Sequence, residues 1–420
     1  MGEFSNRRNK LFDSLPANSV SLVFSGVGKI RSEDDYYKFF ANRNFFYLTG
    51  IEQENSVLML VKCAGERKTY LFLDEYNELK ERWTGRRLTF NEATQISEIQ
   101  NVYSNGTFDS MLSMAVSVEN NMYGKIESLL LDMSDEIKIK LNCSTQIYAK
   151  ELQDKYPHLK IENIYPYIVE LRLIKSDLEV RELEEAINLT STGINDLLLN
   201  LEIGMTEHEL SDRFEYYGRT HGRRELAFET IVAAGKDGTI MHHPIKQQDA
   251  IIKNGDLLLF DLGYRYNGYS ADISRTYPVS GMFNDFQRKV YEAVLNCNKH
   301  IIDFAKPGLK IADLQEEALK TLKNECVRLK ILKEEDDIKK YYIHNVSHFL
   351  GLDTHDVGNR ERPLVPGNII TVEPGLYFVE EGVGVRIEDD VLITPNGSRC
   401  LSKCIKKEIV DIEKMMQHRK

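Results

Sequence analysis

Residues 255–276 read GDLLLFDLGYRYNGYSADISRT, an apolar run and a more polar run joined by an Asn-Gly pair. Asn267-Gly268 between β-type flanks predicts a two-residue hairpin, because both turn positions favour a positive φ. Counting outward from this turn pairs Tyr266 with Tyr269. The stretch is therefore expected to form an antiparallel hairpin with a fixed register.

The expected hairpin brings two carboxylates together. The same counting pairs Asp261 with Ser274 and makes Asp261 and Asp272 diagonal neighbours on one face, since side chains alternate along a strand. Diagonal neighbours lie about 7–8 Å apart, which suits carboxylates that converge on two metal ions about 3.5–4 Å apart. Asp261 also follows the apolar run Leu257–Phe260, where an isolated buried charge is costly. Taken alone, two solvated aspartates beside a turn are the simpler interpretation.

Two further acids lie in strand-like segments. Glu373 follows the β-branched run Ile369–Val372 and precedes a Pro-Gly pair that ends the strand. Glu388 alternates with Arg386 and Asp390, so Arg386 is placed to orient and neutralise an acidic cluster. Each acid by itself is more typical of a charge at a strand edge.

Histidines form a second pattern. His344 and His348 lie four residues apart, His355 follows them, and His242 and His243 are adjacent. Four-residue spacing can place two imidazoles on one helical turn, but a lone histidine is more often an ordinary core or surface residue. Only the whole set of acids and histidines points to a site.

The composition indicates a globular protein. The 42% hydrophobic and 28% charged content shows no disorder-type bias, and 420 residues are enough for two cores. A net charge of −11 without basic runs argues against a nucleic-acid partner. The N-terminus lacks the apolar stretch of a secretory signal, and no apolar run approaches the about 18 residues of a spanning helix. Six cysteines without zinc-ligand or redox-pair spacing indicate reduced thiols and a cytoplasmic location.

Two domains are predicted, at residues 1–168 and 169–420. The first is expected to be a small α/β domain with a last strand near Lys160–Ile164. Its β-type runs are Ser19–Phe24, Phe45–Leu48, Ser56–Val61 and Thr69–Leu73. The segment Tyr165–Lys175 is interpreted as a linker. Helices are expected after it at Leu178–Leu201 and Thr206–Thr220, and each is preceded or opened by a capping-box pattern.

Together, these residues resemble the pita-bread metallopeptidases, the family of creatinase, aminopeptidase P, prolidase and methionine aminopeptidase, and the aminopeptidase P group most closely. Besides the hairpin, the resemblance rests on SHFLGLDTHDVG at 347–358, TVEPGLY at 371–377 and RIEDD at 386–390. It covers about Leu171 to Leu401, and RNFFYLTG at 43–50 is similar to the family's N-terminal domain. The resemblance implies an α/β (α+β) chain, with a small creatinase-like N-terminal α/β domain before a pita-bread catalytic domain.

The resemblance also implies roles for individual residues. Asp261 would chelate one metal ion, His348 and Glu373 would hold the other, and Asp272 and Glu388 would bridge them. Glu373, His242 and His355 are implied as the catalytic residues. Substrate contacts are expected from His242, His344, His355 and Arg386. The chain departs from a frequent family pattern at His243, where a tyrosine is common, which leaves open which neighbour lines the pocket.

The implied reaction is hydrolysis of the Xaa-Pro bond at peptide N-termini by a hydroxide that bridges two divalent metals. One imidazole among four carboxylates is a hard, oxygen-rich ligand set that favours Mn²⁺. A prolidase, which acts on dipeptides, is the alternative enzyme, and the short connection Asn359–Pro366 leaves little material for a lid over a substrate carboxylate. Methionine aminopeptidase is disfavoured because it does not need a large N-terminal domain. A metal-free peptide-binding module on the same fold is the alternative of a different class.

The expected partners are peptides with proline at the second position, with neither nucleic acid nor membrane. Trp83, the only tryptophan, lies in the basic, turn-prone segment Glu81–Arg87. It is therefore a poor core candidate, although a half-buried structural role is an equal alternative. Similar proteins use the N-terminal domain for dimer contacts, so a homodimer or larger homo-oligomer with Trp83 near a subunit boundary is predicted.

Overall fold

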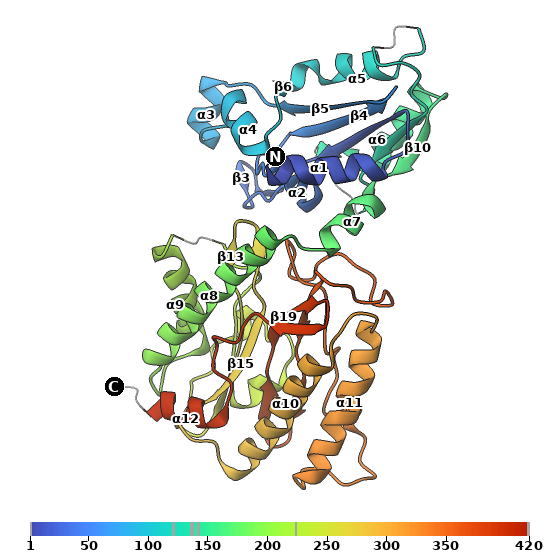
Figure 1. Ribbon diagram of the computed structural model, residues 1–420. Helices are drawn as coiled ribbons and strands as arrows, with labels where there is room; N and C mark the ends of the chain where they lie inside the picture. Colours follow the sequence, from blue (N-terminus) through green and yellow to red (C-terminus); the bar gives the residue numbers. More distant parts are fainter. Residues whose placement is uncertain (1, 120–121, 135–137, 141–142, 223–224, 418–420) are drawn as a thin grey trace. The chain divides into compact units, whose positions relative to one another are not determined.

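The computed structural model describes residues 2–119, 122–134, 138–140, 143–222 and 225–417 (Figure 1). The chain divides into two compact units, Met1–Arg172 and Leu173–Lys420. Among the helices in the described ranges, none combines the length and the apolar character needed to cross a bilayer.

The first unit is built on a mixed six-stranded sheet with the order β10-β7-β1-β4-β5-β6. Its strands are β1 (Ser19–Phe24), β4 (Val57–Cys63), β5 (Glu66–Leu73), β6 (Asn101–Ser104), β7 (Ser128–Leu131) and β10 (Lys160–Asn163). Two short pairs are β2 (Ile30–Ser32) with β3 (Asp35–Tyr36) and β8 (Lys138–Lys140) with β9 (Cys143–Ser144). The helices are α1 (Glu3–Ser14), α2 (Arg43–Thr49), α3 (Glu78–Thr84), α4 (Phe90–Ser97), α5 (Phe108–Val116), α6 (Thr145–Lys155) and α7 (Tyr165–Leu173), with a 3-10 turn η1 (Asn105–Thr107).

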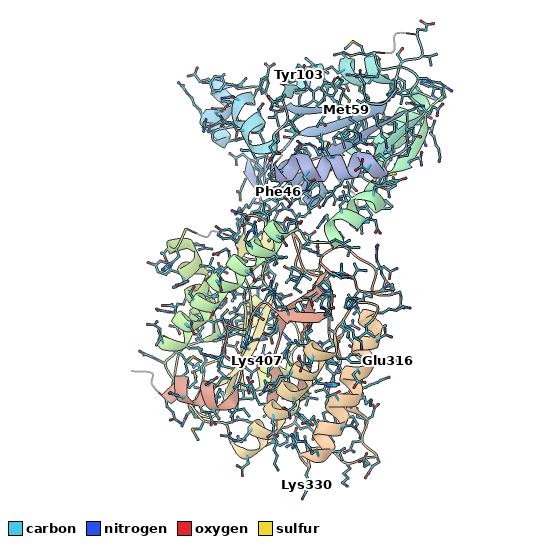
Figure 2. All side chains as sticks on the ribbon, in the orientation of Figure 1. Phe46, Met59, Tyr103, Glu316, Lys330 and Lys407 are labelled. Atoms are coloured by element: carbon cyan, nitrogen blue, oxygen red, sulfur yellow. The ribbon has the colours of Figure 1, made fainter. Side chains whose placement is uncertain are left out.

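Apolar side chains are buried on both faces of this sheet, and one cluster lies on the face covered by α5 and α6. Alternate residues of the strands, such as Leu22 and Met59, share a buried cluster with Leu112 of α5 and Leu152 of α6. Met59 is labelled in Figure 2, and Figure 1 shows α1 and α5 on opposite sides of β4 and β5. Because side chains alternate along a strand, one set packs against the helices on one face of the sheet and the other set against the helices on the opposite face.

Two segments of this unit differ from the sequence prediction. The aromatic run Phe45–Leu48, predicted as a strand, forms helix α2, because the side chain of Asn42 caps its first amides and Gly50 ends it at φ 68°. The predicted linker Tyr165–Lys175 instead contains helix α7. Proline is tolerated in the first turn of a helix, so Pro166 does not prevent it.

The second unit places its strands between two pairs of helices, α8 with α9 and α10 with α11 (Figure 1). The helices are α8 (Asp177–Leu199), α9 (Glu207–Thr220), α10 (Asp285–Phe304), α11 (Ile311–Arg328) and α12 (Ile409–Gln417), with 3-10 turns η2 (Gly235–Thr239), η3 (Ile245–Gln247) and η4 (Ile338–Lys340). One sheet joins β11 (Ile231–Ala234), β12 (Leu257–Leu262) and β15 (Ile273–Pro278), and β13 (Arg265–Tyr266) pairs with β14 (Tyr269–Ser270). Another joins β16 (Ile369–Val372), β19 (Asp389–Thr394) and β20 (Gly397–Cys400), and β17 (Gly375–Phe378) pairs with β18 (Val383–Arg386).

The hairpin has the predicted register. Tyr266 pairs with Tyr269, and Asp261 pairs with Ser274. Asn267 and Gly268 both have positive φ, at 46° and 91°, as a tight turn of this kind requires. The two predicted capping boxes also form, at the starts of α8 and α9.

A glycine allows the two arms of the hairpin to approach each other next to the acids. A Cβ atom on Gly263 would lie 1.9 Å from the carbonyl oxygen of Ala271, so any side chain there would push the arms apart. Because Asp261 and Asp272 lie close to this point, the same glycine keeps their carboxylates close.

Candidate metal centre and active site

A pocket of about 460 Å³ in the second unit gathers most of the predicted site residues. Its wall includes Asp261, Asp272, His348, Glu373, Glu388, His242, His355 and Arg386. His344 does not line this pocket. It contacts Glu373, which does, and Tyr377. Residues from β12, the start of β15, the end of β16 and the end of β18 thus converge, although they span more than a hundred positions in the chain.

The predicted metal ligands lie within a few ångströms of one another. The Nε2 atom of His348 is 3.3 Å from Asp272 Oδ2 and 3.5 Å from Glu373 Oε1. One oxygen each from Asp272 and Glu388, with a nitrogen of His348, lie within 4.8 Å of one another. His348 Nδ1 donates to the carbonyl oxygen of Phe349 at 2.9 Å, which orients Nε2 toward the acids.

Asp261 and Glu388 are linked by a serine. Ser274 Oγ lies 2.7 Å from Glu388 Oε2 and 3.3 Å from Asp261 Oδ1. Ser274 was not among the predicted site residues, although the predicted register already placed it opposite Asp261. The serine therefore holds two acids that come from different strands.

The guanidinium of Arg386 is already hydrogen-bonded to other residues of the protein. Its Nη2 lies 2.5 Å from Asp261 Oδ2, its Nε donates to Ser274 Oγ at 2.7 Å, and its Nη1 donates to the Tyr377 hydroxyl at 3.3 Å. The residue is 2% exposed. The guanidinium thus orients and neutralises the acidic cluster, as the alternation along its strand indicated, and any contact of Arg386 with substrate is secondary to these bonds.

The electrostatics of the protein atoms favour cations in the pocket. Burial raises the pKa of Glu373 to about 7, partly offset by His348 and reinforced by Asp272. Burial and the charge of Asp272 raise the pKa of Glu388 well above its usual range. Burial likewise raises the pKa of Asp261, against the effect of Arg386. Four carboxylates and one imidazole around one space are a hard ligand set. Divalent cations bound there would offset the burial and mutual repulsion of the ionised acids.

The remaining histidines have separate environments. The ring of His355 lies 4.4 Å from that of His348, edge to face, and burial lowers the pKa of His355. Burial, with the nearby Arg386, lowers the pKa of His344 to about 3. His344 Nε2 lies 2.9 Å from the Tyr377 hydroxyl, so this imidazole is neutral and accepts that hydrogen bond. His242 is exposed to the pocket.

Asp390 holds the backbone of a proposed metal ligand, Asp272. Asp390 is fully buried, and its Oδ2 accepts the backbone N–H of Asp272 at 3.3 Å. The alternation with Glu388 placed Asp390 on the site face, but no pattern in the sequence indicated Asp272 as its partner. The contact joins two segments more than a hundred residues apart, which local spacing does not reveal.

Comparison with known proteins agrees with this geometry. Residues 181–395 match the model for metallopeptidase family M24, and residues 4–123 match the aminopeptidase P N-terminal domain. The Xaa-Pro aminopeptidase of Haemophilus influenzae is 33% identical over 99% of this chain and 97% of its own length. That of Escherichia coli is 30% identical over 99% of this chain and 97% of its own length.

Solved structures show the same two-domain fold. A candidate aminopeptidase P from Bacillus anthracis matches with a TM-score of 0.93 and 40% identity over 99% of this chain and 98% of its own. Aminopeptidase P from Escherichia coli with the inhibitor Pro-Leu matches with a TM-score of 0.88 and 29% identity over 99% and 98% of the two chains. The predicted fold class, a creatinase-like N-terminal domain before a pita-bread domain, is confirmed. The chain therefore belongs to metallopeptidase family M24.

Proposed function

We propose that this chain is a metal-dependent exopeptidase that hydrolyses the Xaa-Pro bond at peptide N-termini. The observation that carries the proposal is the convergence of four carboxylates and His348 on one pocket. The relatives named Xaa-Pro aminopeptidase, which match over nearly the whole chain, support this substrate class.

The five converging residues would hold two divalent cations. Asp261 would bind one ion, His348 and Glu373 would bind the other, and Asp272 and Glu388 would serve both. The position of Asp272 and Glu388 beside His348 supports their bridging role. Such ions, when bound, polarise the scissile carbonyl and acidify a water molecule. The oxygen-rich ligand set favours Mn²⁺ over zinc.

The chain's own residues would then move protons and stabilise charge. Glu373 takes a proton from the attacking water and delivers it to the prolyl nitrogen, which must be protonated to leave. His242 and His355, which line the same pocket, donate hydrogen bonds to the carbonyl oxygen as negative charge develops there.

The length of the substrate tests this assignment. A tripeptide Xaa-Pro-Xaa should be cleaved to release the first residue, with activity lost on chelation and restored best by Mn²⁺. Cleavage of Xaa-Pro dipeptides alone would assign the chain as a prolidase instead. Binding of peptides without cleavage, by protein free of metal, would indicate a peptide-binding module.

The proposed setting is a cytoplasmic homodimer or larger homo-oligomer. Trp83, in α3, is 83% exposed, so it does not belong to the core of its own unit. This exposure leaves the indole available for the proposed contact near a subunit boundary.

A further inference from the structure

A buried imidazole–carboxylate pair lies immediately next to His242. His243 Nε2 lies 2.9 Å from Glu207 Oε2, and the two residues are 2% and 0% exposed. A charged or polar pair is seldom buried this completely without a structural or functional reason. His242, its neighbour in the chain, lines the same pocket as His243 but is exposed.

The carboxylate of Glu207 connects this pair to the sheet that carries a proposed ligand. Its other oxygen, Oε1, accepts the backbone N–H of Ala234 at 2.6 Å. Ala234 ends β11, and β11 pairs with β12 so that Ile231 lies opposite Asp261. Glu207 itself is held at the first turn of α9, whose cap is Thr206. These contacts hold the carboxylate of Glu207 in a fixed position relative to β12, the strand that carries Asp261.

The segment that carries His242 has few other attachments. Before it, η2 packs on β18, where a Cβ atom on Gly384 would lie 1.8 Å from the Gly238 carbonyl oxygen. After it, Gln248 is bonded to both Thr230 and His208. For residues 240–247, within the described part of the chain, the His243–Glu207 bond is the single long-range hydrogen bond that the structure gives.

Local chemistry makes this single attachment effective. Pro244 restricts the backbone of His243 to extended conformations, and the bond to Glu207 fixes the direction of its side chain. The imidazole of His243 is thereby held in a buried position, and the residue before it is exposed. His242 lines the same pocket as Asp261 and His355.

We propose that Glu207 and His243 are positioning residues that hold His242 in its reactive place in the pocket. The inference rests on the proposed function, because it assumes that His242 stabilises the transition state. Its consequence is specific: removing the pair should lower kcat through His242 and leave substrate binding and metal content nearly unchanged. A displacement of about 1 Å at such a group can cost about 10²-fold in rate.

A third metal site is the competing explanation, because ligand atoms of Glu207, Asp237 and His243 lie within 4.8 Å of one another. Both oxygens of Glu207 and the Nε2 of His243 are, however, already joined by hydrogen bonds. A cation bound through the Nε2 of His243 would have to displace its bond to Glu207, whereas the buried Nδ1 of His243 has no hydrogen-bond partner among the described residues. The observed bonds therefore favour a hydrogen-bonded pair.

The test is a double-mutant cycle in the metal-loaded, full-length protein with an Xaa-Pro-Xaa tripeptide. Glu207→Ala should lower kcat about 10- to 100-fold with little change in KM, and Glu207→Gln, which keeps a hydrogen bond, should restore most of the rate. In a His242→Ala background, Glu207→Ala should have little further effect. If Glu207→Ala does not fold, His243→Ala removes the pair from its other end and should give the same pattern. Glu317→Ala, at the exposed pair His300–Glu317 of the same 2.9 Å length, is the matched control and should leave kcat unchanged.

The outcomes separate this inference from the proposed function. Equal losses from Glu207→Ala with and without His242 would overturn the positioning role, because the pair would then act through general stability. Loss of bound metal from Glu207→Gln would also overturn it, in favour of the metal site. An unchanged kcat in His242→Ala would also overturn the positioning role, because His242 would then not contribute to catalysis. In contrast, a wild-type protein that does not cleave the tripeptide would remove the proposed function itself.

Discussion

Replacing Glu373 by glutamine should change the stability of the chelated protein in a way that depends on pH. Burial raises the pKa of Glu373 from 4.5 to about 7. In the folded state this acid therefore keeps its proton over a range in which the unfolded chain has released it. Its contribution to stability is fully present below pH 4.5 and is lost as the pH rises through about 7. Glutamine, which does not ionise, removes this loss.

The size of the effect follows from the two pKa values. A pKa of about 7 against 4.5 corresponds to about 3 kcal/mol at high pH, since one unit is about 1.4 kcal/mol. About a quarter of this is already lost at pH 5, so about 2–3 kcal/mol lies between pH 5 and pH 8. For a domain of about 150–250 residues this difference corresponds to about 5–10 °C in Tm.

The assay is thermal unfolding of both proteins at pH 5 and pH 8 after dialysis against a chelator. Relative to wild type, Glu373→Gln should gain stability at pH 8 compared with pH 5. Glu380→Gln, at an exposed position in the turn between β17 and β18, is the control and should give the same small change at both pH values. With Mn²⁺ added, the sign should reverse, because the variant lacks a proposed ligand. An identical Tm difference at both pH values would refute the view that Glu373 is a buried proton-holding acid.

Three further outcomes are expected. Asp272→Ala should lose bound metal and activity together, measured by elemental analysis and peptide cleavage, because a bridging carboxylate serves both ions. His355→Ala should keep its metal and lose about 10²–10³-fold in kcat/KM, as expected for one transition-state hydrogen bond, and equal loss of metal would contradict its assignment to substrate. Light scattering should give at least twice the chain mass of 48.5 kDa, and Trp83→Ala should change KM for long peptides more than for dipeptides. A monomer whose mutant has the same length preference would exclude the proposed role of Trp83.

The hairpin could be predicted from the sequence because its determinants are local. Asn267-Gly268 specifies the turn, the turn specifies the register, and the register places Asp261 opposite Ser274. The start of α8 was predictable for the same reason, since Ser176 and Glu179 satisfy each other's backbone amides within one turn.

Helix α2 shows where local propensity failed. The run Phe45–Leu48 is rich in aromatic residues, which favour strands, yet the cap at Asn42 and the left-handed Gly50 make it helical. Arg8 also donates to the carbonyl oxygen of Leu48, at the end of this helix. Contacts with α1 thus satisfy backbone groups that propensity does not consider.

Only the family resemblance predicted that these residues come together in one site. Glu373 and His348 belong to segments that no spacing rule connects with the hairpin, and each alone is typical of ordinary surface residues. The supporting contacts of Tyr377 with His344 and Arg386 depend on how separate strands pack, so they were not predicted at all.

Charge balance explains why two adjacent acids, Glu388 before β19 and Asp389 at its start, have different roles. Asp389 is fully buried, but Arg275 lies 2.7 Å away and Lys407, labelled in Figure 2, lies 2.6 Å away. Burial opposes ionisation of Asp389, yet these two cations lower its pKa below the usual range. Glu388, one residue earlier, faces the other acids, and burial raises its pKa well above the usual range. The protein supplies the counter-charges for Asp389 itself, whereas Glu388 needs cations from outside, and this difference distinguishes a structural acid from a proposed metal ligand.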